Sequence, residues 1–151
     1  MRSEFETVQF VALGPEIEPL VREASKAGFP FMETLRREWD DGSNRFDQPG
    51  EAYFGAWKSG QLVAAGGLNR DPYAQDAAIG RVRHVYVLNT YRRTGVGRLL
   101  LQSISDLARQ HFTLLRLRTR TEAGAAFYES IGFVRSDEAA ATHVLGLQAA
   151  A

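Results

Sequence analysis

The 151-residue sequence contains no cysteine. That absence excludes disulfide bonds, catalysis by a thiolate and cysteine-ligated metal sites. The sequence also has no run of the ~18 apolar residues that a membrane-spanning helix requires, and its first residues, MRSEFETVQF, lack the apolar core of a signal peptide. We therefore expect a cytoplasmic protein with no membrane partner and no metal.

A net charge is missing too, because 18 Lys and Arg side chains balance 18 Asp and Glu side chains. A neutral chain is a poor candidate for broad binding of nucleic acid or of an anionic membrane surface. Internal repeats and long low-complexity linkers are also absent. The length suits one domain with a proper core, so we expect a single domain over residues 1–151.

What the sequence does contain is organised around residues 81–111. Its β-branched and aromatic residues at 82–87 predict a strand that ends at Asn89. Apolar residues at helical spacing then predict a helix of about four turns that includes Leu100, Ile104 and Ala108. A polar turn joins the strand to the helix.

This turn carries Arg92, Arg93, Gly95, Gly97 and Arg98. Glycines let a ligand approach the backbone, and the first amides of a helix lack internal partners and attract anions. Three arginines at the positive end of a helix dipole are explained by a bound polyanion, most simply a diphosphate. The alternative is a solvated basic turn beside a capped helix.

The spacing separates this turn from two other phosphate-binding loops. A Walker loop needs Lys followed by Ser or Thr after its last glycine, but Arg98 follows Gly97. A dinucleotide-binding loop needs a third glycine where Leu100 stands. The pattern Arg92-x-x-Gly95-x-Gly97 after a strand instead resembles the acetyl-CoA signature of the GNAT superfamily of N-acetyltransferases.

A second segment adds to this resemblance. Residues 125–133 read AAFYESIGF, and GNAT proteins commonly carry Phe/Leu-Tyr-x-x-x-Gly-Phe at this point. The resemblance implies that the strand before the signature diverges from the strand after it, and that the pantetheine of acetyl-CoA inserts between them. It assigns to cofactor binding Val85, Tyr86, Val87, Arg92, Arg93, Thr94, Gly95, Val96, Gly97, Arg98, Thr121 and Phe127.

Tyr128 is the residue that the resemblance implies for catalysis. In many members a tyrosine at this point protonates the departing thiolate. A phenol with a pKa near 10 holds its proton until negative charge develops on the sulfur. The alternative is a core aromatic ring whose hydroxyl is hydrogen-bonded within the protein.

The chain also departs from the family pattern. Thr121 stands where an asparagine often contacts the cofactor, and Gly124 stands where alanine is common. Positions that carry a Glu or His base in some members hold Arg81 and Arg83, which cannot accept a proton near neutral pH. Strand alternation turns His84 to the other face unless a bulge intervenes, which favours a packed or surface imidazole over a base. The amine would then lose its proton to water or bind already neutral.

The remaining segments complete a mixed α/β fold. The expected strands are residues 5–13, 52–58, 61–68, 113–120, 133–134 and 142–147, and the expected helices begin near residues 15–19, 31 and 123. Gly66-Gly67 suggests a bulge or a close approach. With the central strand and helix, these elements give a GNAT-like sheet of about seven strands flanked by four helices on both faces.

Five side chains outside the signature are candidates for an acceptor site. In GNAT-like chains the region of Glu33, Trp39 and Arg45 often borders the acceptor cleft, although a surface pair and a half-buried anchor are the simpler explanation. Arg70 and Tyr73 lie either in an acceptor-binding loop or in an ordinary polar hairpin loop.

These observations favour an acetyl-CoA-dependent N-acetyltransferase. The amine would attack the thioester directly in a ternary complex, because no cysteine can carry the acyl group. The acceptor would be a small-molecule amine or a peptide amine, and the arginines at 70, 81 and 83 favour one with a carboxylate or phosphate. The alternative is an acyl-CoA-binding sensor or scaffold without transfer activity. A homodimer and the preferred acyl-chain length stay open.

Overall fold

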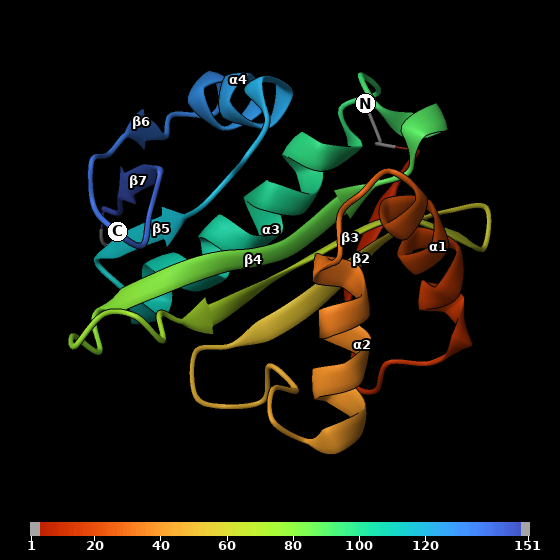
Figure 1. Cartoon of the computed structure of the whole chain (residues 1–151), viewed down its shortest axis with the longest axis horizontal. Helices are drawn as coiled ribbons and strands as arrows, with labels where there is room; N and C mark the ends of the chain where they lie inside the picture. The colour runs from red at the N-terminus through yellow and green to blue at the C-terminus, as the bar shows by residue number, and fades with distance from the viewer. Residues whose placement is uncertain (1–3, 149–151) are drawn as a thin grey trace.

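A seven-stranded sheet runs through the structure, a computed structural model that describes residues 4–148 (Figure 1). The elements, in chain order, are β1 (Glu6–Gln9), a 3-10 turn (Pro15–Ile17), α1 (Glu18–Lys26), α2 (Phe31–Asp41), β2 (Ala52–Lys58), β3 (Gln61–Arg70), β4 (Ile79–Val87), a 3-10 turn (Asn89–Tyr91), α3 (Val96–His111), β5 (Leu114–Leu117), α4 (Glu122–Ser130), β6 (Val134–Arg135) and β7 (His143–Gly146).

The strands lie in the order β1-β2-β3-β4-β5-β7-β6, and every neighbouring pair is antiparallel except β4 and β5. In the described part of the chain, the expected mixed fold of seven strands and four helices is confirmed. Three strands are shorter than predicted, since β1 ends at Gln9, β5 ends at Leu117 and β7 covers only His143–Gly146. In β5 the reason is the loss of neighbours: Leu117 is its last residue paired with β7, and β4 has already diverged.

Local sequence signals account for several element ends. Ser59 and Gly60, with φ of 50° and 79°, both adopt the left-handed conformation that a two-residue hairpin requires. Gly42, with φ of 81°, ends α2 in the same conformation. At the start of α4, the Thr121 hydroxyl accepts a hydrogen bond from the Gly124 amide and caps the helix. Such element ends can be predicted from the sequence because each depends on two to four adjacent residues.

Helices α1 and α2 lie over one face of β2, β3 and β4, and α3 lies over the other (Figure 1). A Cβ on Gly67 would touch Tyr53 on the α2 side, whereas a Cβ on Gly66 would touch Leu100 of α3. Helix α4 shares the face of α3, since Phe127 packs beside the first turn of that helix. Both layers are apolar, and their fully buried side chains include Ile17, Leu20, Met32, Leu35, Leu100, Leu101 and Ile104.

A bulge interrupts β4 opposite the two glycines of β3. Ala65 pairs with Tyr86 but Gly67 pairs with Arg83, so β4 contains one extra residue between these pairs. His84, at the bulge, has φ of +55°. The predicted irregularity at Gly66-Gly67 is therefore present, but the additional residue belongs to β4. Its consequence is that His84 turns toward the face that α2 covers.

Within residues 4–148, no helix is long and apolar enough to cross a membrane. The same residues contain no cluster of three His, Cys, Asp or Glu side chains that could hold a metal ion.

Candidate active site

The region expected to bind the cofactor begins where β4 parts from β5. The two strands pair only between Ile79–Arg81 and Leu114–Arg116, although β4 continues to Val87. After Leu117 the chain leaves the sheet toward α4 (Figure 1). The divergence expected from the sequence is therefore present. Val85 and Val87 lie in the part of β4 that has no strand neighbour on this side within the described residues.

Helix α3 begins at the end of this divergent strand, and its first turn is uncapped. Gly95 occupies the N-cap with φ of 89°, no side chain caps the helix, and no acidic residue lies in the first turn. A Cβ on Gly95 would meet nothing within 4 Å, so its glycine is needed for the backbone conformation and leaves the approach open. The Val96 amide has only a long contact, 3.4 Å, with Thr94 Oγ1. Free amides at a positive helix end suit an anion.

The arginines around this turn are exposed, but one of them has a partner. The Arg92 guanidinium lies 5.7 Å from the centroid of the Tyr86 ring, and its Nη2 lies 3.4 Å from the Tyr86 hydroxyl. That hydroxyl donates to Glu23 of α1 over 2.7 Å. Burial and the hydrogen bond to Glu23 raise the pKa of Tyr86 to about 12. The Tyr86 side chain thus ties α1 to β4, and only its backbone faces the divergence.

Gly97 has a different role from the one its motif suggests. A Cβ there would lie 3.2 Å from Phe127 and 3.6 Å from Val87. The missing side chain therefore lets α4 pack against α3, whereas the glycine that leaves space for a ligand is Gly95. Phe127, predicted to contact the cofactor, lies between the first turn of α3 and the end of β4.

Tyr128 lies in the adjoining part of α4 and is 9% exposed. Its ring meets Phe127 and Phe133 edge-on, with centroids 5.1 and 5.6 Å away. Burial raises the pKa of its phenol well above the usual value, so the hydroxyl is protonated at neutral pH. Residues 4–148 offer this hydroxyl no hydrogen-bond partner. The hydroxyl oxygen is not among the buried unpartnered atoms of these residues, so it is open to solvent or to a ligand.

The two departures from the family pattern in α4 have a structural reason. Thr121 uses its hydroxyl oxygen to cap the helix, with 2.9 Å to the Gly124 amide. A Cβ on Gly124 would lie 2.2 Å from Oγ1 of Thr119, so alanine does not fit beside this threonine.

Arg81 does not lie free at an acceptor site, contrary to the sequence-based expectation. It is 5% exposed and its Nη1 lies 3.2 Å from Oδ2 of Asp71, which also accepts from Arg116 Nε over 2.9 Å. Arg116 in turn contacts Glu138, and Arg81 donates to the carbonyl of Ala140 over 2.6 Å. We call Asp71, Arg81, Arg116 and Glu138 the arginine network. Its two cations and two carboxylates balance, although Nη2 of Arg116 is buried without a partner in the described chain.

A second polar contact on this face joins His84 to Glu38 of α2, a residue that the sequence did not single out. His84 Nε2 and Glu38 Oε1 lie 3.9 Å apart. Both atoms are buried, and neither has a hydrogen-bond partner within residues 4–148. The contact is not an ion pair, because burial and the charge of Arg83 lower the pKa of His84 to about 3 and leave the ring neutral.

Comparisons with known proteins agree with this geometry. The family profile described as "Acetyltransferase (GNAT) domain" matches residues 49–135, which is more than half of the chain. The chain belongs to the GNAT acetyltransferase family.

Relatives of this GNAT chain are known at the levels of sequence and structure. The N-alpha-acetyltransferase RimI of Mycobacterium tuberculosis is 34% identical over 91 residues, which are 58% of this chain and 54% of RimI. The chain thus matches about half the length of this curated relative. A protein of Exiguobacterium sp. 255-15, assigned as an acetyltransferase, has a crystal structure with a TM-score of 0.84 and 31% identity, covering 94% of this chain and 93% of that one. Ard1 of Thermoplasma volcanium, at 20% identity, shares the fold with a TM-score of 0.69 over 97% and 99% of the two chains.

Other acceptor candidates of the GNAT chain are now accounted for. Arg83 lies on the α2 side, with Nη1 3.4 Å from the Asn69 side chain, and is partly exposed. Tyr73 covers the buried Arg81 guanidinium at 4.8 Å, whereas Arg70 is exposed and its amide donates to Glu51. Tyr73 therefore covers Arg81, whereas Arg83 is partly exposed on the same face.

The candidates on α2 are mainly structural. Trp39 is buried and stacks on Phe46, and Arg45 donates to the Trp39 carbonyl over 2.7 Å at the helix end. Glu33 accepts a hydrogen bond from Ser25 of α1 over 2.7 Å.

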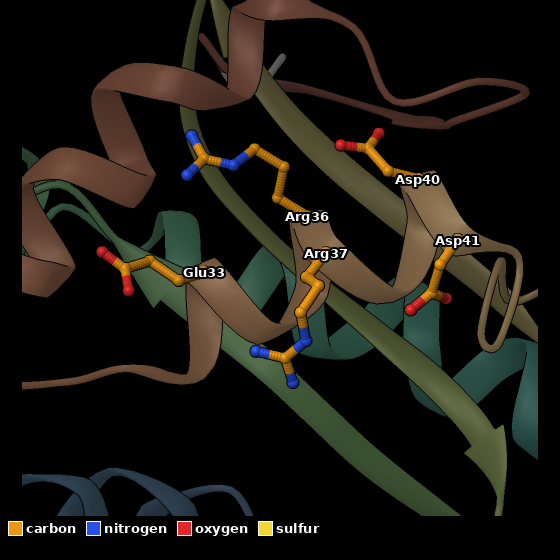
Figure 2. A pocket seen from close by; sticks show the side chains of 5 residues that line it. All are labelled: Glu33, Arg36, Arg37, Asp40 and Asp41. Atoms are coloured by element: carbon orange, nitrogen blue, oxygen red, sulfur yellow. The ribbon is translucent and has the colours of Figure 1, made fainter.

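An open depression on α2 is lined by Glu33, Arg36, Arg37, Asp40 and Asp41 (Figure 2). Arg36 and Asp40 project to the side of α1, where Arg36 pairs with Glu18, while Arg37 and Asp41 project to the other side (Figure 2). Because these charges diverge, the depression is a solvated helix face.

Proposed function

We propose that this chain is an acetyl-CoA-dependent N-acetyltransferase that moves an acetyl group to a primary amine. The observation that carries the proposal is the uncapped start of α3, which lies at the end of a strand that has parted from its neighbour. Membership of the GNAT family supports it. The RimI relative, named as an N-alpha-acetyltransferase, supports an amine at a peptide N-terminus as one acceptor class beside small-molecule amines.

The donor fits the residues at this site. The open space at Gly95 and the first turn of α3, which its N-cap residue does not cap, suit a diphosphate, with Arg93 and Arg98 as exposed counter-charges. The backbone of Val85 and Val87 would hold the pantetheine arm as an added strand would be held. Acetyl-CoA supplies an acetyl group that is activated as a thioester.

The chain's own residues would act by positioning the two reactants and by donating a proton. The neutral amine nitrogen bonds to the acetyl carbon as the carbon–sulfur bond breaks, and the Tyr128 hydroxyl gives its proton to the leaving sulfur. The nitrogen releases one proton to water, and Tyr128 regains one from water. The raised pKa of Tyr128 keeps that proton in place until negative charge develops. Holding the two reactants in one geometry supplies several kcal/mol more.

The test compares Tyr128→Phe with the wild-type protein. We expect the variant to bind CoA with unchanged affinity in titration calorimetry and to release free thiol ~10²-fold more slowly, as general acid catalysis typically contributes at least that factor. Phe133→Leu, which alters a ring packed on Tyr128 but removes no hydroxyl, is the matched control. Turnover that is unchanged in Tyr128→Phe would remove the acid role.

The same titration separates an enzyme from an acyl-CoA sensor. CoA binding without thiol release across a broad panel of amines would favour the sensor. No association with CoA would overturn the proposal altogether.

A further inference from the structure

Two buried polar atoms face each other where α2 packs on the strand proposed to hold the cofactor. They are Oε1 of Glu38 and Nε2 of His84, 3.9 Å apart and both unpartnered within residues 4–148. A buried polar atom without a partner costs free energy, so native proteins seldom retain two of them together without a function. A ligand that donates one hydrogen bond to each atom would satisfy both.

The surroundings hold the imidazole in place, and the side of Glu38 is the more exposed one. His84 stacks on Phe31, with centroids 6.3 Å apart and planes 9° apart, and meets Phe46 edge-on. Tyr53 donates to the His84 carbonyl over 2.7 Å and so holds the bulge. The Glu38 side chain is 26% exposed and that of His84 only 7%. A ligand would therefore pass the carboxylate and end at the imidazole.

The charges define which ligand fits. A carboxylate accepts hydrogen bonds only, and the neutral imidazole accepts at Nε2 when its proton is on Nδ1. A group that bonds to both atoms needs two N–H or O–H donors, which a single hydroxyl lacks and a primary amino group has; the charge of Glu38 favours its protonated form. Arg83 places positive charge on the same face, so Glu38 is the group that attracts a cation here.

We propose that Glu38 and His84 bind the acceptor's amino group as it arrives as a primary ammonium, with one N–H directed to each; a third N–H gives its proton to water before the nitrogen attacks the thioester. This inference rests on the proposed transferase function and names the residues that recognise its acceptor. His84 directly precedes Val85, so the bound nitrogen lies beside the segment proposed to hold pantetheine. The bulge is what brings the imidazole to this position, since a regular strand would turn it away.

Binding can be measured without any turnover. The His84 ring signals of the full-length protein, with CoA present, are followed by NMR while alanine amide or Nα-acetyl-lysine amide is added. We expect both amines to shift these signals, and their fully acetylated counterparts, which lack the ammonium, to leave them unchanged. If neither amine shifts the His84 signals, or if the acetylated controls shift them equally, the inference is wrong.

Kinetics supply the second readout. Glu38→Gln should raise the KM of the acceptor amine at least tenfold, as loss of a hydrogen bond to a charged group does, and leave the KM of acetyl-CoA unchanged. His84→Phe keeps a stacked ring without Nε2 and should raise the same KM. Asp40→Asn, an exposed carboxylate on the same helix, is the control and should change neither constant.

The two proposals fail in different ways. Acetyl transfer with an unchanged acceptor KM in Glu38→Gln would overturn the ammonium site alone. A wild-type protein that transfers nothing, but whose His84 signals respond to amines, would overturn the transferase function alone.

Discussion

The arginine network and the Glu38–His84 pair both lie on the side of the sheet where α2 packs, and they differ in how far the chain satisfies them. In the arginine network, Asp71 accepts from two guanidinium groups and each arginine has a second partner. In the pair, two buried polar atoms face each other without a hydrogen-bond partner among the described residues. Buried charge alone therefore does not indicate a binding site in this protein.

The comparison also corrects an inference about charge. Arg81 and Arg83 are two residues apart on one strand, and the sequence gives them the same expected role. Asp71 neutralises Arg81 and Tyr73 covers it, while Arg83 stays partly exposed and acts on His84. A buried, balanced network holds the loop between β6 and β7 onto the sheet; an unbalanced pair next to a bulge is available to a ligand.

The largest effect should come from removing the centre of the arginine network. Asp71→Asn would leave two buried guanidinium groups without their carboxylate and lower the free energy of unfolding by about 3–5 kcal/mol, measured by urea denaturation. Glu138→Gln, which changes the more exposed carboxylate of the network, should cost less than about 1 kcal/mol. Equal losses of unfolding free energy in the two variants would show that Asp71 is not the centre of the arginine network.

The stabilising contribution of Asp71 should also depend on pH in a defined direction. Burial alone would raise its pKa, but hydrogen bonds from Arg116 and the Tyr73 amide and the charge of Arg81 lower it overall. The contribution is thus fully present above the unfolded value near 3.9 and is lost as the pH falls through the lower folded value.

A second pH effect should appear at milder acidity, where only part of it develops, and arise from His84. Its folded pKa of about 3 lies below the unfolded value of about 6.5, so the unfolded chain binds the proton first as the pH falls. Stability from this residue is therefore present above pH ~6.5 and falls by up to about 1.4 kcal/mol per pH unit below it. His84→Phe should flatten this part of the stability–pH curve, measured by denaturation at several pH values. An unchanged slope in that variant would show that the ring is not the titrating group.

The smallest effect should come from Glu38. Glu38→Gln removes a charge that has no hydrogen-bonded partner at Oε1, so the free energy of unfolding should change by less than about 1 kcal/mol. Thermal denaturation with Asp40→Asn as the matched variant measures this. A loss of unfolding free energy as large as that of Asp71→Asn would show that Glu38 stabilises the fold as Asp71 does. The contrast between the arginine network and the Glu38–His84 pair would then not hold.

Much of the fold could be predicted from the sequence because the residue patterns that indicate it are local. Alternation and helical spacing predicted the order of elements. The two strands joined at Ser59-Gly60 and the start of α4 were placed to within about two residues. The ends of β1 and β5 were not, because a strand ends where its neighbours stop pairing, and pairing is a property of the whole sheet.

By itself, the sequence determined the strand, turn and helix over residues 79–111, since backbone conformation and helix polarity depend on residues a few positions apart. Only the tertiary structure decided what the side chains around them do: that Gly97 admits Phe127, that Arg81 is neutralised, and that a bulge turns His84 toward Glu38. The physical reason is that burial, charge balance and hydrogen-bond partners come from segments distant in the chain, and a one-residue shift in register moves a side chain to the opposite face.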